Sequence, residues 1–194
     1  EADLMSPILP RTFEGQLDLT NTYCTCALTG DGVQCWGDNE YGQTTVPHLN
    51  NPISIEIGSI HTCALTRDGV RCWGNNEYGQ TDVPYLRNPK SISAGESHTC
   101  VLTDDGVHCW GDNEYGQTDV PDLENPTMIA LGGDHTCALT DNGVKCWGNN
   151  EYGQTDVPEL GKPTKIALGG YHTCALTDDG VQCWGSNYNG QMEI

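Results

Sequence analysis

Basic side chains are scarce in this chain. It carries 8 lysines and arginines against 27 aspartates and glutamates, a net charge of −19 over 194 residues. Nucleic-acid binding needs a basic surface that displaces counterions from phosphates, and an anionic membrane surface attracts proteins in the same way. We therefore expect no nucleic-acid partner. The acidity indicates either a solvated surface or a face that binds cations or a basic partner.

Long apolar runs and known catalytic motifs are also missing. No stretch of about 18 apolar residues occurs, so we expect no membrane insertion. The start, Glu1-Ala2-Asp3-Leu4, lacks the basic and apolar regions of a signal peptide, so we expect any such peptide to be gone already. No G-x-S-x-G, H-E-x-x-H or phosphate-binding glycine loop is present. We expect the chain not to be an enzyme and to need no cofactor.

One short stretch of sequence occurs five times. Its last copy reads H-T-C-A-L-T-D-D-G-V-Q-C-W-G from His172 to Gly185, and its two cysteines and its tryptophan recur every 37 residues. A fixed period between 20 and 50 residues indicates a supersecondary unit that buries its apolar face against its neighbours. An N-terminal extension at residues 1–13 precedes five repeats at about 14–50, 51–87, 88–124, 125–161 and 162–194.

Each later repeat has the pattern of four short antiparallel strands. The cysteine stretch predicts the second and third strands, joined at an Asp-Gly turn. The first strand follows an Asn-Pro or Lys-Pro turn and is predicted at Ile53–Ile57, Ser91–Ala94, Thr127–Leu131 and Thr164–Leu168. A brief fourth strand is predicted to end at Pro47, Pro84, Pro121 and Pro158. Four short strands per repeat predict an all-β fold, a β-propeller of five blades.

The two ends of the array are irregular. Ser6–Pro10 loosely resembles the D-V-P segments of later repeats, so the extension is predicted to be a closing strand or a tether. Leu17 and Leu19 stand one residue out of phase with the apolar positions of the other repeats, which predicts a bulge or an inverted face. The last repeat stops at Ile194, inside its fourth strand. Either the N-terminal strand completes the last blade, or one end pairs with another chain.

Ten of the eleven cysteines form five C-x8-C pairs. If Thr177 to Gly180 form the hairpin loop, Cys174 lies opposite Cys183 at a separation that a disulfide can bridge. We predict one cross-strand disulfide per blade: Cys26–Cys35, Cys63–Cys72, Cys100–Cys109, Cys137–Cys146 and Cys174–Cys183.

Five disulfides indicate an oxidising compartment, so the chain is expected to be secreted, at the cell surface or periplasmic. Cys24 is left over, as a buried thiol, an intermolecular partner or a competitor for Cys35.

The unit H-T-C-A-L-T-x-D-G-V-x-C-W-G-x-N-x-Y-G-Q resembles the repeat of the regulator of chromosome condensation superfamily, over about residues 14–194. Its G-Q-T-D-V-P continuation is more similar to a bacterial exported branch that includes a propeller-type β-lactamase inhibitor. The resemblance implies a propeller whose loops or faces recognise another protein. Members typically have about seven blades, whereas this chain encodes five. Nucleotide exchange and chromatin binding are not implied, because the basic surface is missing, and the contact residues for β-lactamase inhibition cannot be mapped.

One repeat position carries histidine four times and cysteine once. A closed ring would relate these side chains by pseudo-symmetry, and imidazoles with a thiolate suit zinc or copper. The other interpretation is a packed histidine that hydrogen-bonds a neighbouring blade, because the spacing of blades is too wide for one ion to reach more than two of them. The residues at this position are His61, His98, His135, His172 and Cys24.

A repeated Asn-Glu-Tyr-Gly corner follows the tryptophan of the first four repeats, and the tryptophan itself is expected to pack between blades. Tyrosines in turns suit contacts with sugars or proteins. The glutamates could join a calcium site, although the corner lacks the dense D-x-D-x-D spacing of a dedicated loop. The candidate binding surface consists of Tyr41, Tyr78, Tyr115 and Tyr152 with Glu40, Glu77, Glu114 and Glu151.

Three functions are consistent with these features. The favoured one is an exported, non-catalytic propeller that binds a protein partner or assembles with itself, because near-identical blades present near-identical surfaces. The second is a multivalent lectin, in which five like sites give avidity for a glycan. The third is a metal-binding propeller that uses the histidine and Cys24 position.

Overall fold

The computed structural model describes residues 16–18 and 23–193. This part of the chain forms 15 strands, and it contains no helix long and apolar enough to cross a membrane. The predicted extension at residues 1–13, its resemblance at Ser6–Pro10, and Ile194 lie outside the described residues.

The described strands form five antiparallel sheets of three, one for each repeat. They are β1 (Gln16–Asp18), β2 (Cys24–Thr29) and β3 (Gly32–Gly37); β4 (Pro52–Ile57), β5 (His61–Thr66) and β6 (Gly69–Gly74); β7 (Ser91–Ala94), β8 (His98–Thr103) and β9 (Gly106–Gly111); β10 (Met128–Leu131), β11 (His135–Thr140) and β12 (Gly143–Gly148); and β13 (Pro163–Leu168), β14 (His172–Thr177) and β15 (Gly180–Gly185). The first strands predicted in the last four repeats are confirmed to within one residue at each end.

The cysteine hairpin has the register that the sequence predicts. Cys174 pairs with Cys183 and Leu176 with Val181, but Thr177 also pairs with Gly180, so the loop has two residues rather than four. Gly180 has a φ of 117°, a conformation that favours glycine. The same register recurs in every repeat, and one cross-strand disulfide per blade is confirmed, with Cα atoms 4.1 Å apart in each.

The predicted fourth strand is wrong in the described sheets, each of which has three strands. The segments that end at Pro47, Pro84, Pro121 and Pro158 lie outside the sheet ladders. Their backbone N–H groups bond locally instead. The N–H of Asp82 donates to Gly79, and the N–H of Val83 donates to Thr81. Proline then has no N–H to offer to a ladder.

At Leu17, within the described strand of residues 16–18, there is neither the predicted bulge nor an inverted face. Leu17 pairs with Ala27 in the same way that Ile55 pairs with Ala64, and the β1–β2 pairing has no register shift. Leu17 therefore takes the strand position of Ile55. Leu19 lies outside the described residues.

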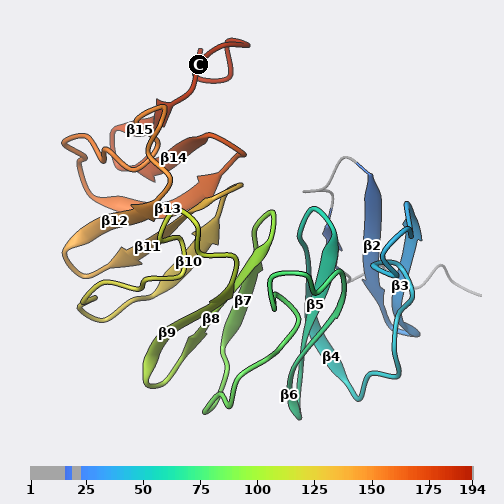
Figure 1. The fold of residues 1–194 in the computed structure, drawn as a ribbon. Coiled ribbons are helices and arrows are strands. Elements are labelled where there is room, and N and C mark those ends of the chain that lie inside the picture. The colour runs from blue at the N-terminus through green and yellow to red at the C-terminus, as the bar shows by residue number, and fades with distance from the viewer. Residues whose placement is uncertain (1–15, 19–22, 194) are drawn as a thin grey trace, which may run out of the picture.

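The five sheets follow one another as blades in an open arc (Figure 1). The first strands β4, β7, β10 and β13 contact one another in sequence order. The first sheet, in blue, and the last, in orange and red, lie at opposite ends of the arc (Figure 1). Each described strand ladder runs within one sheet. The N-terminal strand predicted to complete the last blade lies outside the described residues.

The apolar core lies between blades. Leu65 on β5 is 3% exposed and packs with Ile92 and Val101 of the next blade. Each hairpin directs leucine and the disulfide towards the following blade and directs threonine and alanine towards the preceding one. Burial of one such leucine contributes about 1.5–3 kcal/mol. A blade in this fold is therefore fully packed only when both its faces are covered.

Candidate functional site

In the first four blades, a buried glutamine holds the corner against the next blade. The Oε1 atom of Gln80 accepts the N–H of Tyr78 at 3.0 Å, and its Nε2 donates to Asn75 at 3.1 Å. Its backbone carbonyl accepts from the Thr99 hydroxyl at 3.1 Å and from the Trp110 indole at 3.0 Å. The corner is thus fixed from both sides, and the tryptophan lies between blades.

All the corners lie on one edge of the arc, together with the turns that follow the first strands. The N–H of Asn75 donates to the Ile60 carbonyl at 2.9 Å, and the N–H of Asn149 donates to the Asp134 carbonyl at 2.8 Å. The four corner tyrosines are 37% to 53% exposed. We call this surface the corner edge: Tyr41, Tyr78, Tyr115, Tyr152, Tyr171 and Tyr188 with Glu40, Glu77, Glu96, Glu114, Asp134 and Glu151.

The C-terminal part of the corner edge gathers three aromatic rings. The ring of Tyr152 lies edge-on to Tyr171 at 5.4 Å and to Tyr188 at 5.8 Å between centroids. A cavity of about 380 Å³ lies between Tyr152 and Tyr188, with Ser186 and Asn187 in its wall. Partly exposed tyrosines supply rigid contact area with a polar tip, which suits protein recognition.

Carboxylates gather beside these rings. Asp134 is half-buried, and burial raises its pKa to about 6, helped by the charges of Glu96, Asp112 and Glu114. The pKa of the Tyr171 hydroxyl is raised by Glu96, then by burial and by Asp134. No cation offsets either shift. The corner edge therefore holds uncompensated negative charge that an incoming cation would stabilise.

The sequence patterns did not single out Glu96, Asp134 or Tyr171. All three lie in the turn between the first and second strands of a blade. Asp134 and Tyr171 directly precede the repeated histidine, and Glu96 stands two residues before it. The available signal was variation: this turn differs from blade to blade, whereas the stretch around it is nearly constant. Loops that vary on a constant scaffold commonly carry binding residues.

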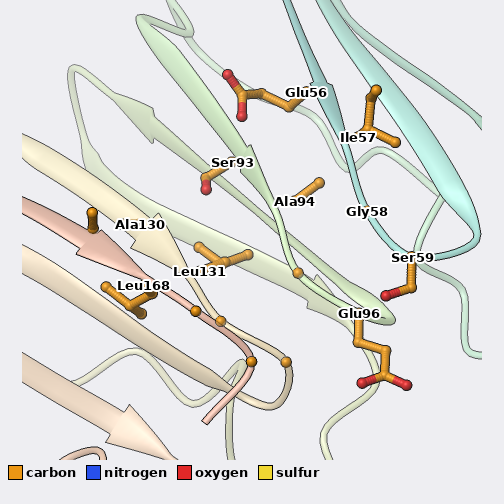
Figure 2. A pocket seen from close by; sticks show the side chains of 16 residues that line it. Glu56, Ile57, Gly58, Ser59, Ser93, Ala94, Glu96, Ala130, Leu131 and Leu168 are labelled. Carbon is orange, nitrogen blue, oxygen red and sulfur yellow. The ribbon is translucent and has the colours of Figure 1, made fainter. Parts of the chain in front are cut away.

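A second cavity, of about 340 Å³, lies where the first strands converge (Figure 2). Its wall consists mainly of backbone, glycines and small side chains such as Ser93 and Ala94. Glu56 on β4 and Glu96, just past the end of β7, supply its carboxylates (Figure 2). Glu96 therefore belongs both to this cavity and to the corner edge, so the acidic surface continues into the inner side of the arc.

The repeated histidines of the interior blades join each blade to the next. Each interior imidazole Nε2 lies 2.9 to 3.0 Å from a threonine hydroxyl of the next blade: His61 to Thr99, His98 to Thr136 and His135 to Thr173. Burial lowers their pKa values, to about 4, 3 and 4 respectively, so the rings are neutral. Within residues 16–18 and 23–193, no three His, Cys, Asp or Glu side chains are grouped to hold a metal ion.

Cys24 occupies the histidine position of the first blade. It is 3% exposed, lies outside the five disulfides and packs with Ile55 and Ile57 of the second blade. This position is the core between two blades rather than the surface, where an intermolecular disulfide forms most readily.

Solved structures of similar fold come from plants, yeast and human. The ectodomain of the Physcomitrella patens receptor kinase CR4 has 29% identity and a TM-score of 0.73, covering 84% of this chain and 50% of its own length. Prp20p from Saccharomyces cerevisiae has 22% identity and a TM-score of 0.71, with coverages of 84% and 56%. Human WBSCR16 has 22% identity and a TM-score of 0.72, with coverages of 89% and 62%. The chain thus spans between half and two thirds of these structures.

No curated protein matches the chain. The family model of the regulator of chromosome condensation (RCC1) repeat matches residues 53–80, 90–117, 129–154 and 164–191, which together make up more than half of the sequence. These matches begin in or directly before the first strand of each of the last four blades and end in or beside its corner. By sequence and by fold, the chain belongs to the family of RCC1-repeat proteins.

Proposed function

We propose that this chain is an extracellular, non-catalytic protein-interaction module, and that its corner edge binds a basic region of a partner protein. The observation that carries the proposal is the grouping of Asp134 and Glu96 with the rings of Tyr171 and Tyr152. Exposed aromatic rings give contact area and cation–π attraction, and the carboxylates give electrostatic complementarity to lysine or arginine.

The disulfides and one relative support the extracellular part of the proposal. Five disulfides persist in an oxidising compartment and are rare in the cytosol. One solved structure of similar fold, with 29% sequence identity, is the ectodomain of a receptor kinase. A propeller of this kind therefore has a precedent outside the cell.

Protein recognition has precedents in the same fold. Prp20p from Saccharomyces cerevisiae has binding properties towards Gsp1p and histones, and yeast RCC1 (Prp20) has been solved bound by Kap60. These proteins share the scaffold with this chain at 22% identity. They support a protein-interaction role in general, whereas the basic partner is inferred from the charge of this chain.

The lectin hypothesis is less well supported by the geometry. It predicts five like sites, but the described corners differ. The rings of Tyr152, Tyr171 and Tyr188 contact one another at the C-terminal end. A single composite patch suits one protein epitope better than a repeating glycan.

Peptide display with a library rich in basic residues tests the proposal. Peptides selected on the wild-type chain are expected to lose at least about tenfold in affinity for a Glu96→Gln/Asp134→Asn variant, and to bind more weakly at high salt. The matched control is Glu159→Gln/Asp178→Asn, which removes the same charge from exposed positions away from the corner edge. Equal losses in both variants would mean that the peptides respond to net charge alone, which would contradict a site at the corner edge.

A further inference from the structure

One corner of the molecule departs from the repeated Asn-Glu-Tyr-Gly pattern. The last repeat reads Ser186-Asn187-Tyr188-Asn189-Gly190, so a tyrosine stands where the first four repeats have glutamate. Asn189 in turn stands where those repeats have tyrosine. The aromatic ring has therefore moved by one position along the corner, through a change in the residues of the repeat itself.

The glutamate position of a corner lies near the tyrosine of the preceding corner. The charge of Glu114 first, and that of Glu151 in the following blade among others, raises the pKa of Tyr115. Tyr188 takes the repeat position of Glu151, and its ring centroid lies 5.8 Å from that of Tyr152. The contact of these two rings therefore lies between the fourth and fifth blades, on the side of the last blade that faces the preceding one.

These two tyrosine rings form walls of a cavity. The planes of Tyr152 and Tyr188 meet at 86°, and both residues line a cavity of about 380 Å³ together with Gly185, Ser186 and Asn187. A volume above about 300 Å³ is typical of small-molecule sites, which combine apolar walls with a few polar groups. The cavity thus has two aromatic walls at a right angle and room for a small ligand group.

Hydrogen bonds position the rings in advance. The N–H of Asn189 donates to the Gln191 side chain at 2.9 Å, and the N–H of Ser186 donates to the Tyr171 carbonyl at 2.9 Å. The second bond ties the turn that carries Tyr171 to the base of the corner, and the ring of Tyr171 lies 5.4 Å from that of Tyr152. Groups that are ordered before binding reduce the entropy lost on binding.

The surroundings of the cavity favour a cation, although its wall is uncharged. The charge of Glu96, then burial and the charges of Asp134 and Glu151 among others, raises the pKa of Tyr171. Among the described residues, the five that line the cavity carry no charge. A lysine or arginine side chain would find no carboxylate in that wall to replace its hydrogen bonds to water. A quaternary ammonium group has no N–H to satisfy, and the faces of aromatic rings attract it.

We propose that this cavity binds a quaternary ammonium group, with its methyl groups against the rings of Tyr152 and Tyr188. Choline and trimethyllysine both carry such a group. The choice of a cation rests on the proposed function, which it deepens by naming one chemical group that the corner edge binds. The residues that carry the two proposals differ: aromatic rings hold the quaternary ammonium group, whereas the carboxylates of Glu96 and Asp134 hold a basic side chain.

NMR titration of the chain with choline, followed through the backbone amides, tests the proposal. The shift changes are expected to saturate and to be largest at Tyr152, Asn187 and Tyr188. The uncharged isostere of choline, in which carbon replaces the nitrogen, is expected to bind at least about fivefold more weakly, because it lacks the cation–π attraction. Equal binding of the two compounds would indicate apolar contact alone and would overturn the proposal, as would shift changes that do not saturate.

Tyr188→Glu is the decisive variant, because it restores the residue of the first four repeats and adds a negative charge. Loss of the ring is expected to weaken choline binding at least about fivefold. Tighter binding by this variant would mean that charge alone attracts the cation, which would overturn the proposal. Tyr188→Phe keeps the ring and should bind like the wild type. The matched control is Tyr85→Glu, the same change at a tyrosine that is 91% exposed and lies outside the corner edge.

The Glu96→Gln/Asp134→Asn variant separates this site from the proposed function. It is expected to lose the selected basic peptides and to keep most of its choline binding, whereas Tyr188→Glu should do the reverse. Basic peptides that bind a chain to which choline does not bind would overturn the cavity proposal alone. Choline binding without any selected basic peptide would support the cavity and contradict the proposed function.

Two further ligands identify the source of the group. A peptide that contains trimethyllysine is compared with the same peptide unmethylated, and with choline. Tighter binding of the methylated peptide than of both others indicates a side chain of a protein partner, and tighter binding of choline indicates a choline compound. Both results support a quaternary ammonium site, whereas equal binding of the methylated and unmethylated peptides, with no binding of choline, would overturn it.

Discussion

The imidazole Nε2 of His98 lies 3.0 Å from the hydroxyl oxygen of Thr136, which stands 38 residues further along the chain in the next blade. Both side chains are fully buried. The same hydroxyl donates to the Gln117 carbonyl at 2.9 Å. One threonine of the fourth blade therefore bonds both the second strand and the corner of the third blade, and the repeat of the sequence becomes a repeat of this connection.

Replacement of His98 by alanine should destabilise the chain by roughly 2–4 kcal/mol, because it leaves a cavity and removes a buried hydrogen bond. The matched control is His172→Ala, at the same position of the last blade, where the ring is half-buried. We expect that change to cost less than about 1 kcal/mol in the isolated chain. Urea denaturation measures both, and equal losses would show that the contact between blades contributes little.

Gly95→Ala should also destabilise the chain. A Cβ atom there would lie 2.4 Å from Cε1 of His98 and 2.7 Å from the Gly132 carbonyl oxygen, so the histidine or the backbone must move. Overpacking of this kind costs about 1–3 kcal/mol. Gly170→Ala is the control, because nothing lies within 4 Å of its Cβ position. Thermal unfolding should separate the two variants, and a wild-type melting temperature for Gly95→Ala would contradict the packing described.

The free energy of unfolding should fall as the pH drops from 6.5 towards 4. The pKa values of His61, His98 and His135 are lowered by burial, so the unfolded chain binds these protons at a higher pH than the folded chain does. Each histidine contributes a slope of about 1.4 kcal/mol per pH unit at most within this window. Asp134 acts in the opposite direction, because its raised pKa favours the folded state as the pH falls through about 6.

Urea denaturation at a series of pH values checks this dependence, with two variants that remove one contribution each. Asp134→Asn should steepen the loss of stability in acid, and His98→Asn should make it shallower. A stability that does not change between pH 6.5 and 4 would mean that the histidines titrate alike in the folded and unfolded chains.

Removal of one interior disulfide by Cys100→Ser/Cys109→Ser should cost about 2–3 kcal/mol. The two cysteines are separated by 9 positions, so the bond closes a short loop and restricts the unfolded chain modestly. Urea denaturation of the variant and the wild type measures the loss.

The thiol of Cys24, which is 3% exposed, should react with a thiol reagent only after the protein is denatured. Rapid reaction of a thiol in the native wild-type protein would contradict the burial of Cys24.

Much of the fold could be predicted because the repeat is strict. The alternation of H-T-C-A-L-T and V-x-C-W-G around a glycine specifies the hairpin register, which in turn specifies the pairing of Cys174 with Cys183. The fourth strand could not be predicted correctly from alternation. Its N–H groups are already used by turns such as Asp82 to Gly79, a competition that only the backbone geometry reveals.

The candidate site was predictable only in part. The repeated Asn-Glu-Tyr-Gly pattern indicates exposed corners, and these corners lie on one edge. The sequence does not show that Asp134 and Tyr171 lie beside them, because that contact depends on how the turn before each histidine meets the corners of its own blade and of the preceding blade. The offset of Leu17 was misleading because the pairing of strands, and not the spacing in the sequence, decides the position of a residue: Leu17 pairs with Ala27 as Ile55 pairs with Ala64.

The central claim is that the corner edge, rather than net acidity, recognises a basic partner. The most direct measurement is an NMR titration of the chain with a short arginine-rich peptide at physiological salt, followed through the backbone amides. The account predicts that the largest shift changes occur at Glu96, Asp134 and Tyr171. Changes spread evenly over exposed acidic residues, including Asp31 and Asp178 at the hairpin turns, would contradict it.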